Sequence, residues 1–151
     1  MKRFKLWSVL ALAMVAPACG GAMGQVPVRG DDAEVARLAG EWKGQFEGVD
    51  NAKTGTIDLN FQLGRHTADA RVTLLGASTD GSAMKLKVEY LAVENGTIRG
   101  KIEPYVDPEC SCKVETEFEG ALTGDYIVGT YFARPAAGGE RKGQWSAERV
   151  D

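Results

Sequence analysis

The sequence predicts an all-β fold, an eight-stranded antiparallel up-and-down barrel that is preceded by one short helix. Three observations lead to this prediction. After Gly40 the apolar residues recur at every second position, which is the period of a strand with one buried face. The 19 glycines are spread between these alternating segments, where tight turns are expected. The joins are too short for a helical crossover, so neighbouring strands should run antiparallel.

The ten residues before the alternating segments are predicted to form the short helix. Asp31 or Asp32 can cap its first turn, and Gly40 can end it. Val35 and Leu38 lie three residues apart, so both are expected to rest against the body of the domain.

Eight strands follow from the alternation. The dipeptide Asn95-Gly96 is a strong signal for a two-residue hairpin, because a type I′ turn needs two positive φ angles. Hairpin-linked strands with one apolar face bury those faces when the sheet closes into a barrel, and a two-sheet sandwich is the alternative. The predicted strands are Glu41–Gly48, Gly55–Leu63, Thr67–Leu75, Met84–Val93, Gly96–Glu103, Lys113–Leu122, Asp125–Ala133 and Arg141–Arg149.

Two features at the ends of the predicted barrel carry a family resemblance. Gly40-Glu41-Trp42 is a G-x-W motif directly after the short helix, and Arg149 stands at the end of the last strand. On these residues the chain resembles the calycin superfamily, which includes lipocalins, fatty-acid-binding proteins and avidins. Gly124-Asp125-Tyr126 is similar to the lipocalin T-D-Y turn, with Gly in the place of Thr. The resemblance implies that Trp42 plugs the barrel floor under the Arg149 guanidinium, and that the other end opens onto an apolar cavity.

Apolar side chains on the predicted inward faces are the candidate ligand contacts. Small residues on the same faces either leave room for a ligand or let a flattened barrel close on itself. Few polar side chains are expected inside, so a ligand should be lipid-like or a hydrophobic small molecule. The ligand-binding candidates are Phe46, Phe61, Leu86, Tyr90, Phe118 and Trp145. The other predicted inward-facing residues are Leu59, Val72, Val88, Val114 and Val128.

Residues 1–18 have the three parts of an export signal. A positively charged start is followed by an apolar stretch that is too short to span a bilayer, and then by Ala16-Pro17-Ala18. A small residue directly before Cys19 resembles the lipobox of bacterial lipoproteins, which implies a lipid anchor on Cys19 and attachment to a membrane. The alternative is cleavage after Ala18 that releases a soluble secreted or periplasmic protein.

The predicted lipoprotein has three parts: the signal peptide 1–18, a tether 19–30 and the barrel domain 31–151. The tether is rich in Gly, small residues and Pro, which is typical of a flexible linker. In lipoproteins that this chain resembles, Asp directly after the lipidated cysteine favours retention in the inner membrane. Gly20 at that position favours the outer membrane of the cell envelope.

Cys110 and Cys112 are predicted to form a disulfide. If Cys19 is lipidated, they remain as an even pair. Residues i and i+2 of an extended strand lie about 7 Å apart, so the bridge needs a local turn, for which Pro108 is suited. The alternatives are unpaired thiols or a soft-metal or redox site. The metal interpretation lacks further ligands, because the one histidine, His66, lies in a distant turn.

Charge and missing motifs narrow the function. The chain carries a formal charge of -3; without the leader's Lys2, Arg3 and Lys5, 15 basic residues face 21 acidic ones, which gives -6. Binding to nucleic acid is therefore not expected. With a single histidine, no G-x-S-x-G, no P-loop and no dinucleotide fingerprint, we expect no enzyme, no cofactor and no metal site.

The expected function is that of a cell-envelope lipoprotein whose lipocalin-like barrel binds a small hydrophobic or lipid-like ligand. The alternative is an envelope barrel that binds another protein, as an inhibitor or assembly factor, with a filled interior. An interior cavity of roughly a few hundred Å³ favours the carrier, whereas a filled interior with an exposed apolar patch favours the protein-binding alternative. The sequence makes no prediction of the oligomeric state.

Overall fold

The computed structural model describes residues 24–77 and 80–150. The predicted leader and Cys19 lie outside the described residues. Within them the chain is almost entirely β-structure, as predicted. The elements are β1 (Gly24–Arg29), α1 (Asp32–Arg37), β2 (Gly40–Gly48), β3 (Thr54–Phe61), β4 (Thr67–Leu75), β5 (Met84–Leu86), β6 (Val88–Glu94), β7 (Thr97–Asp107), β8 (Cys112–Thr123), β9 (Tyr126–Pro135) and β10 (Arg141–Val150).

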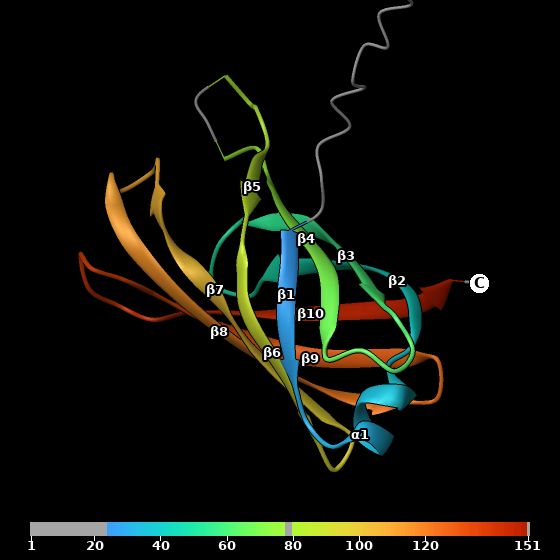
Figure 1. Ribbon diagram of the computed structural model, residues 1–151. Coiled ribbons are helices and arrows are strands. Elements are labelled where there is room, and N and C mark those ends of the chain that lie inside the picture. Colours follow the sequence, from blue (N-terminus) through green and yellow to red (C-terminus); the bar gives the residue numbers. More distant parts are fainter. Residues whose placement is uncertain (1–23, 78–79, 151) are drawn as a thin grey trace, which may run out of the picture.

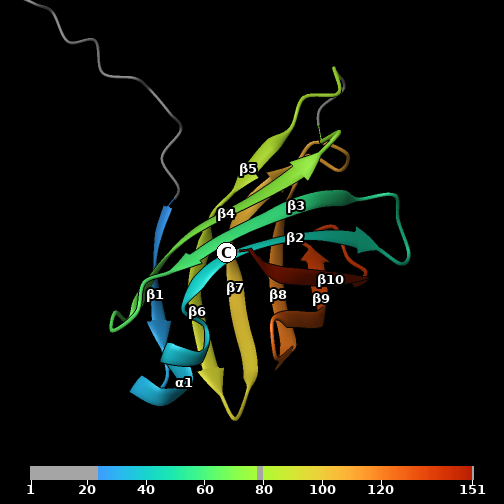
Figure 2. The same ribbon diagram turned by 90° about the vertical axis from the view of Figure 1, so that its right-hand side faces the viewer.

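Nine strands close into a barrel (Figures 1 and 2). Around it they follow the order β1-β6-β7-β8-β9-β10-β2-β3-β4, and β4 pairs with β1 to complete the ring. Consecutive strands from β2 to β5 and from β6 to β10 pair antiparallel, and β10 pairs with β2. The up-and-down connection is therefore as predicted, and the closed ring rules out the two-sheet sandwich. β5 pairs with β4 outside the ring of nine.

The prediction of eight purely antiparallel strands is wrong at one place. The predicted strand Met84–Val93 is divided at Lys87 into β5, which pairs with β4, and β6, which does not. β1 fills the gap between β4 and β6, antiparallel to the first and parallel to the second, so the barrel is mixed. Gly24–Arg29 lies within the range predicted to be a tether, and its Val26 and Val28 are buried.

Helix α1 closes one end of the barrel, which we call the floor, and we call the opposite end the mouth (Figure 2). Its N-cap Asp31 accepts a hydrogen bond from the Glu34 amide over 2.8 Å. Val35 and Leu38 are buried, as predicted. Asn95 and Gly96, in the β6–β7 turn, both have positive φ, which confirms the predicted hairpin. Among the described residues, no helix is long and apolar enough to cross a membrane.

The floor is held by the pair that the resemblance singled out. The Trp42 indole donates a hydrogen bond to the Leu38 carbonyl over 2.8 Å. The Arg149 guanidinium lies 4.5 Å from the Trp42 ring centroid and donates to the carbonyls of Arg37 and Ala39. Because these carbonyls lie at the end of α1, Arg149 ties the helix to the last strand as well as covering the indole.

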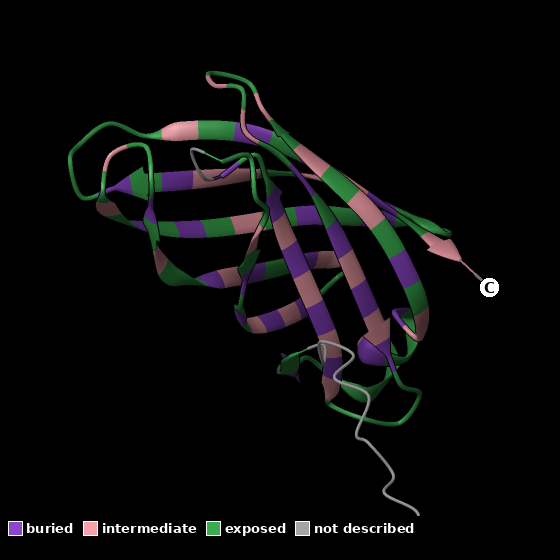
Figure 3. Cartoon of the chain, turned by 90° about the horizontal axis from the view of Figure 1, so that it is seen from above, coloured by how far each residue is buried: buried purple, intermediate pink, exposed green. Residues whose placement is uncertain are grey.

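Buried and more exposed residues alternate along the strands (Figure 3). This is the pattern expected when every second side chain points into the barrel. Two β-bulges reverse this alternation, one between Val88 and Tyr90 and the other between Ile102 and Tyr105. The first turns Tyr90 outward, where the Arg29 guanidinium lies 4.8 Å from its ring centroid. The expectation that Tyr90 points inward is therefore wrong.

Val128 also lies on the outer face, where it is 63% exposed, and its neighbour Ile127 is fully buried instead. The inward set of β9 is thus Ile127, Gly129, Tyr131 and Ala133. The half of the barrel next to the floor is filled. The side chains that fill it include Leu38, Trp42, Phe61, Leu91, Ile98 and Ile127.

Candidate binding cavity

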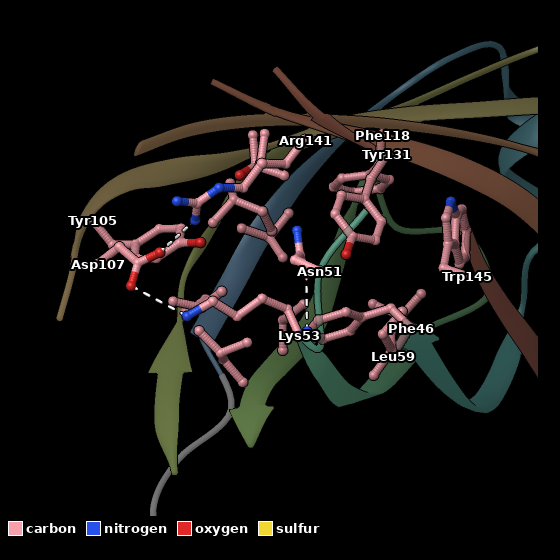
Figure 4. A pocket seen from close by; sticks show the side chains of 18 residues that line it. Phe46, Asn51, Lys53, Leu59, Tyr105, Asp107, Phe118, Tyr131, Arg141 and Trp145 are labelled. Atoms are coloured by element: carbon pink, nitrogen blue, oxygen red, sulfur yellow. Dashed lines mark hydrogen bonds and ion pairs between the residues drawn. The ribbon is translucent and has the colours of Figure 1, made fainter. Parts of the chain in front are cut away.

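The half of the barrel next to the mouth holds a cavity (Figure 4). Its volume is about 80 Å³. That is room for several water molecules or one small organic molecule, and it is below the roughly 300–1,000 Å³ of pockets for drug-sized ligands. The wall is mostly aliphatic and aromatic, and the lining residues are Phe46, Asn51, Lys53, Ile57, Leu59, Val72, Leu74, Leu86, Val88, Ile102, Tyr105, Asp107, Thr116, Phe118, Tyr131, Ala133, Arg141 and Trp145.

Each of four aromatic rings that line the cavity lies against a glycine on the neighbouring strand. The directly paired residues are Phe46 with Gly55, Phe118 with Gly100, Tyr131 with Gly143 and Trp145 with Gly129. A Cβ added to any of these glycines would lie 2.1–2.5 Å from the facing ring. The missing side chains therefore let the rings lie flat against the wall.

The four rings also pack in pairs. Phe46 meets Tyr131 edge to face with 5.7 Å between ring centroids, and Phe118 meets Trp145 in the same way at 5.7 Å. The Trp145 indole donates to the Glu119 carbonyl over 3.0 Å. This packing against the wall keeps the rings out of the barrel axis, which leaves the space that forms the cavity.

A buried carboxylate with two cations stands at the mouth (Figure 4). Asp107, at the end of β7, is 1% exposed. One of its oxygens accepts from Lys53 Nζ over 3.2 Å, and the other accepts from Arg141 Nη1 over 2.9 Å. Glu109 pairs with the same Lys53 over 3.1 Å. The four residues come from three separate parts of the chain. Their ion pairs link the β2–β3 connection, the end of β7 and the start of β10.

Burial by itself would raise the pKa of Asp107. The hydrogen bonds from the Glu109 amide, Lys53 and Arg141 outweigh this effect and hold the pKa below its ordinary value. Asp107 is therefore ionised at neutral pH, and the charges of this cluster offset one another.

The turn next to Asp107 carries the two cysteines. Their sulfur atoms lie 1.98 Å apart, at disulfide distance, and the Cα atoms are 5.0 Å apart. Ser111 between them has a positive φ of 50°, which supplies the local turn that the sequence requires. The Glu109 amide donates to Asp107 over 2.9 Å, so the bridged turn and the buried carboxylate form one unit at the mouth.

Three hydroxyl groups line the wall below this cluster. The Thr116 side chain is 9% exposed, and its Oγ1 atom has no hydrogen-bond partner among the described residues. The Tyr105 hydroxyl lies near Thr116 Oγ1 and the contact by itself would lower the pKa of Tyr105, but the geometry of the two groups falls outside that of a hydrogen bond. Burial raises the pKa of Tyr105, and it raises that of Tyr131 to about 12, with a further contribution from Tyr105. Both phenols are neutral at physiological pH.

Four of the six candidate ligand contacts line the cavity: Phe46, Leu86, Phe118 and Trp145. Phe61 does not line it and is buried in the core nearer the floor, and Tyr90 faces outward. Sequence reasoning missed the polar residues of the mouth. It ended the fifth strand at Glu103, whereas β7 continues to Asp107 after the bulge. The alternation of Tyr105, Val106 and Asp107 could have indicated that the strand continues beyond Glu103. In the structure Val106 is exposed, and Tyr105 and Asp107 face inward.

No protein-family model matches the chain, and no curated protein or solved structure matches it either.

Proposed function

We propose that this barrel binds a small, largely apolar molecule in the cavity between the Phe118–Trp145 pair and the mouth. The observation that carries the proposal is the free volume itself, which is kept open by aromatic rings that lie on glycines. The volume is smaller than the roughly few hundred Å³ expected of a lipid carrier, and the interior is not filled as the protein-binding alternative expects. The volume favours a small molecule over a full-length lipid.

We also propose a binding protein and not an enzyme. The charged residues of the mouth bind one another, since Asp107 accepts hydrogen bonds from both Lys53 and Arg141. His66 lies in the turn between β3 and β4 and contacts Asp32 and the Val28 carbonyl, away from the cavity lining. The arrangement supports enclosure of a molecule without supplying a nucleophile and a base that face it.

The experiment is an NMR titration of the full chain with benzene and n-hexane. Trp145 lines the cavity and Trp42 lies at the floor, so their indole N–H signals report on two regions of one sample. We expect a saturable shift of the Trp145 signal and little change at Trp42. The absence of a saturable shift with both probes would show that the proposal is wrong.

A pair of matched variants localises the binding. Ala133 lines the cavity, and Ala121 is exposed on the outer face of β8. Ala133→Leu should fill the space and abolish the shift, whereas Ala121→Leu should leave it unchanged. Circular dichroism checks that both variants keep the barrel. A fluorescent fatty acid tests whether a lipid also fits. If it binds to the native protein, is displaced by benzene or n-hexane, and does not bind to Ala133→Leu, the interior widens to take a lipid.

For the location we propose a cell-envelope lipoprotein that is anchored in the outer membrane through Cys19. The proposal is supported by the sequence of the leader, in which a small residue directly precedes Cys19. Mass spectrometry of the protein from its native membrane tests this proposal. A mature N-terminus at any residue other than Cys19 would contradict it.

A further inference from the structure

We infer that the ligand of this cavity carries an uncharged hydrogen-bonding group, a hydroxyl or a carbonyl, that pairs with the Thr116 hydroxyl. The inference rests on the proposed function and specifies the chemical class of the ligand, a short aliphatic alcohol or ketone and not a carboxylate. It follows from two independent features of the cavity: the unpaired hydroxyl in its wall and the balance of charge at its mouth.

Thr116 is the one buried side-chain polar atom among the described residues that lacks a partner. Its strand neighbours are Ile102 on β7 and Ala133 on β9, which also line the cavity, and the nearest polar group is the Tyr105 hydroxyl. A buried hydroxyl without a partner is unfavourable, because folding removes its hydrogen bonds to water without replacing them. A ligand group that bonds to Thr116 would recover this cost, and an aliphatic chain alone would not.

The mouth offers no excess charge for an ionised headgroup. Lys53 and Arg141 contribute two positive charges, and Asp107 and Glu109 contribute two negative ones, all linked by the ion pairs described above. A carboxylate that entered the cavity would lose its hydration without gaining an unpaired cation. The phenols of Tyr105 and Tyr131 are neutral, so they too offer hydrogen bonds and no charge.

The position of Thr116 sets the orientation of the ligand. Along β8 it lies between Cys112, at the mouth, and Phe118, which forms part of the cavity wall with Trp145. A ligand with its polar group at Thr116 therefore places a short chain against the aromatic rings. The volume of about 80 Å³ requires this chain to be short.

The test compares three six-carbon probes on the full chain: 1-hexanol, hexanoate and n-hexane, each titrated at pH 7 with the Trp145 indole signal as readout. We expect 1-hexanol to bind at least tenfold more tightly than hexanoate. In Thr116→Val, which keeps the shape and removes the hydroxyl, the affinity for 1-hexanol should fall about five- to tenfold, as expected for one lost hydrogen bond. The affinity for n-hexane should stay the same or rise.

Thr130→Val is the matched control, because Thr130 is exposed on the outer face of β9. It should change no affinity. Urea unfolding shows whether Thr116→Val folds, and removal of an unpaired buried hydroxyl should leave its stability equal or higher. Tighter binding of hexanoate, or an unchanged 1-hexanol affinity in Thr116→Val, overturns the inference while the proposed function stands. If no probe binds, n-hexane included, the proposed function fails with it.

Discussion

The floor and the mouth of this barrel are built from the same hairpins but are packed in opposite ways. Near the floor, large side chains fill the interior and α1 covers the end. Near the mouth, aromatic side chains of similar size leave space free. The two tryptophans show why. Trp42 pairs across the strands with Leu59 and Arg149, so it has a large side chain on both sides. Trp145 pairs with Phe46 on one side and with Gly129 on the other, and its ring lies over the glycine against the wall.

The comparison shows that the two indoles differ in what stands beside them on the neighbouring strands. Both indoles are buried, and both donate to a backbone carbonyl, Trp42 to Leu38 and Trp145 to Glu119. Their burial and hydrogen bonding are therefore alike, and the difference lies in what stands opposite each ring. We expect the floor to provide most of the stability and the mouth to provide the binding site.

The largest effect is expected from truncation of the two tryptophans. Trp42→Ala removes a fully buried ring, its hydrogen bond and its contact with Arg149, and should lower the free energy of unfolding by about 3–5 kcal/mol. Trp145→Ala should cost clearly less, because the space it vacates joins a cavity that already exists. Urea unfolding of the two variants measures the difference. An equal loss in both would show that the two halves are packed alike.

Most of the floor could be predicted from the sequence. The period of two, the Asn95-Gly96 turn and the pairing of Trp42 with Arg149 are local or terminal signals, and each is present in the structure. β1 was missed because six residues that include Gly24 and Pro27 carry only two buried valines, too few for a periodic signal.

The mouth was less accessible to sequence reasoning, because its contacts depend on register. Asp107 is 54 residues from Lys53 and 34 from Arg141. A bulge between Ile102 and Tyr105 turns Asp107 inward, and such a bulge has no local signature in a chain of many glycines. The pairing of each cavity ring with a glycine likewise becomes visible only once the strands are aligned.

A second, smaller effect is expected at the mouth. Asp107→Asn leaves Lys53 and Arg141 without their shared carboxylate and should lower the free energy of unfolding at pH 7 by about 2 kcal/mol. The control Asp125→Asn removes an exposed partner of Arg149 at the floor and should cost less than about 1 kcal/mol. A loss in Asp107→Asn no larger than in this control would show that the buried cluster adds nothing.

The same variant predicts a pH dependence. The pKa of Asp107 is lower in the folded protein than in the unfolded chain, so its stabilising contribution is complete above about pH 4 and is lost as the pH falls through the folded pKa. Urea midpoints between pH 3 and 6 should therefore fall more steeply for the native protein than for Asp107→Asn. Parallel curves would contradict the assignment.

The smallest effect is expected at the floor, with the opposite sign. His66 Nε2 donates a hydrogen bond to the Asp32 carboxylate over 2.8 Å, and this hydrogen bond raises the pKa of the exposed imidazole above its ordinary value of about 6.5. The contribution of the pair is complete below that value and is lost as the pH rises through the raised pKa. An NMR titration should show the raised pKa in the native protein and its return towards about 6.5 in Asp32→Asn.

Glu34→Gln is the control for this pair, because Glu34 lies on the same helix but binds the Gly96 amide instead of His66. It should leave the His66 titration unchanged, and a pKa that Asp32→Asn does not move would assign the shift to another neighbour. The two ends of the barrel thus lose these contributions in opposite directions, the mouth in acid and the floor above neutrality. Both contributions are complete only between about pH 4 and 6.5, so a double variant, Asp107→Asn with Asp32→Asn, should flatten the stability profile on both sides of that window.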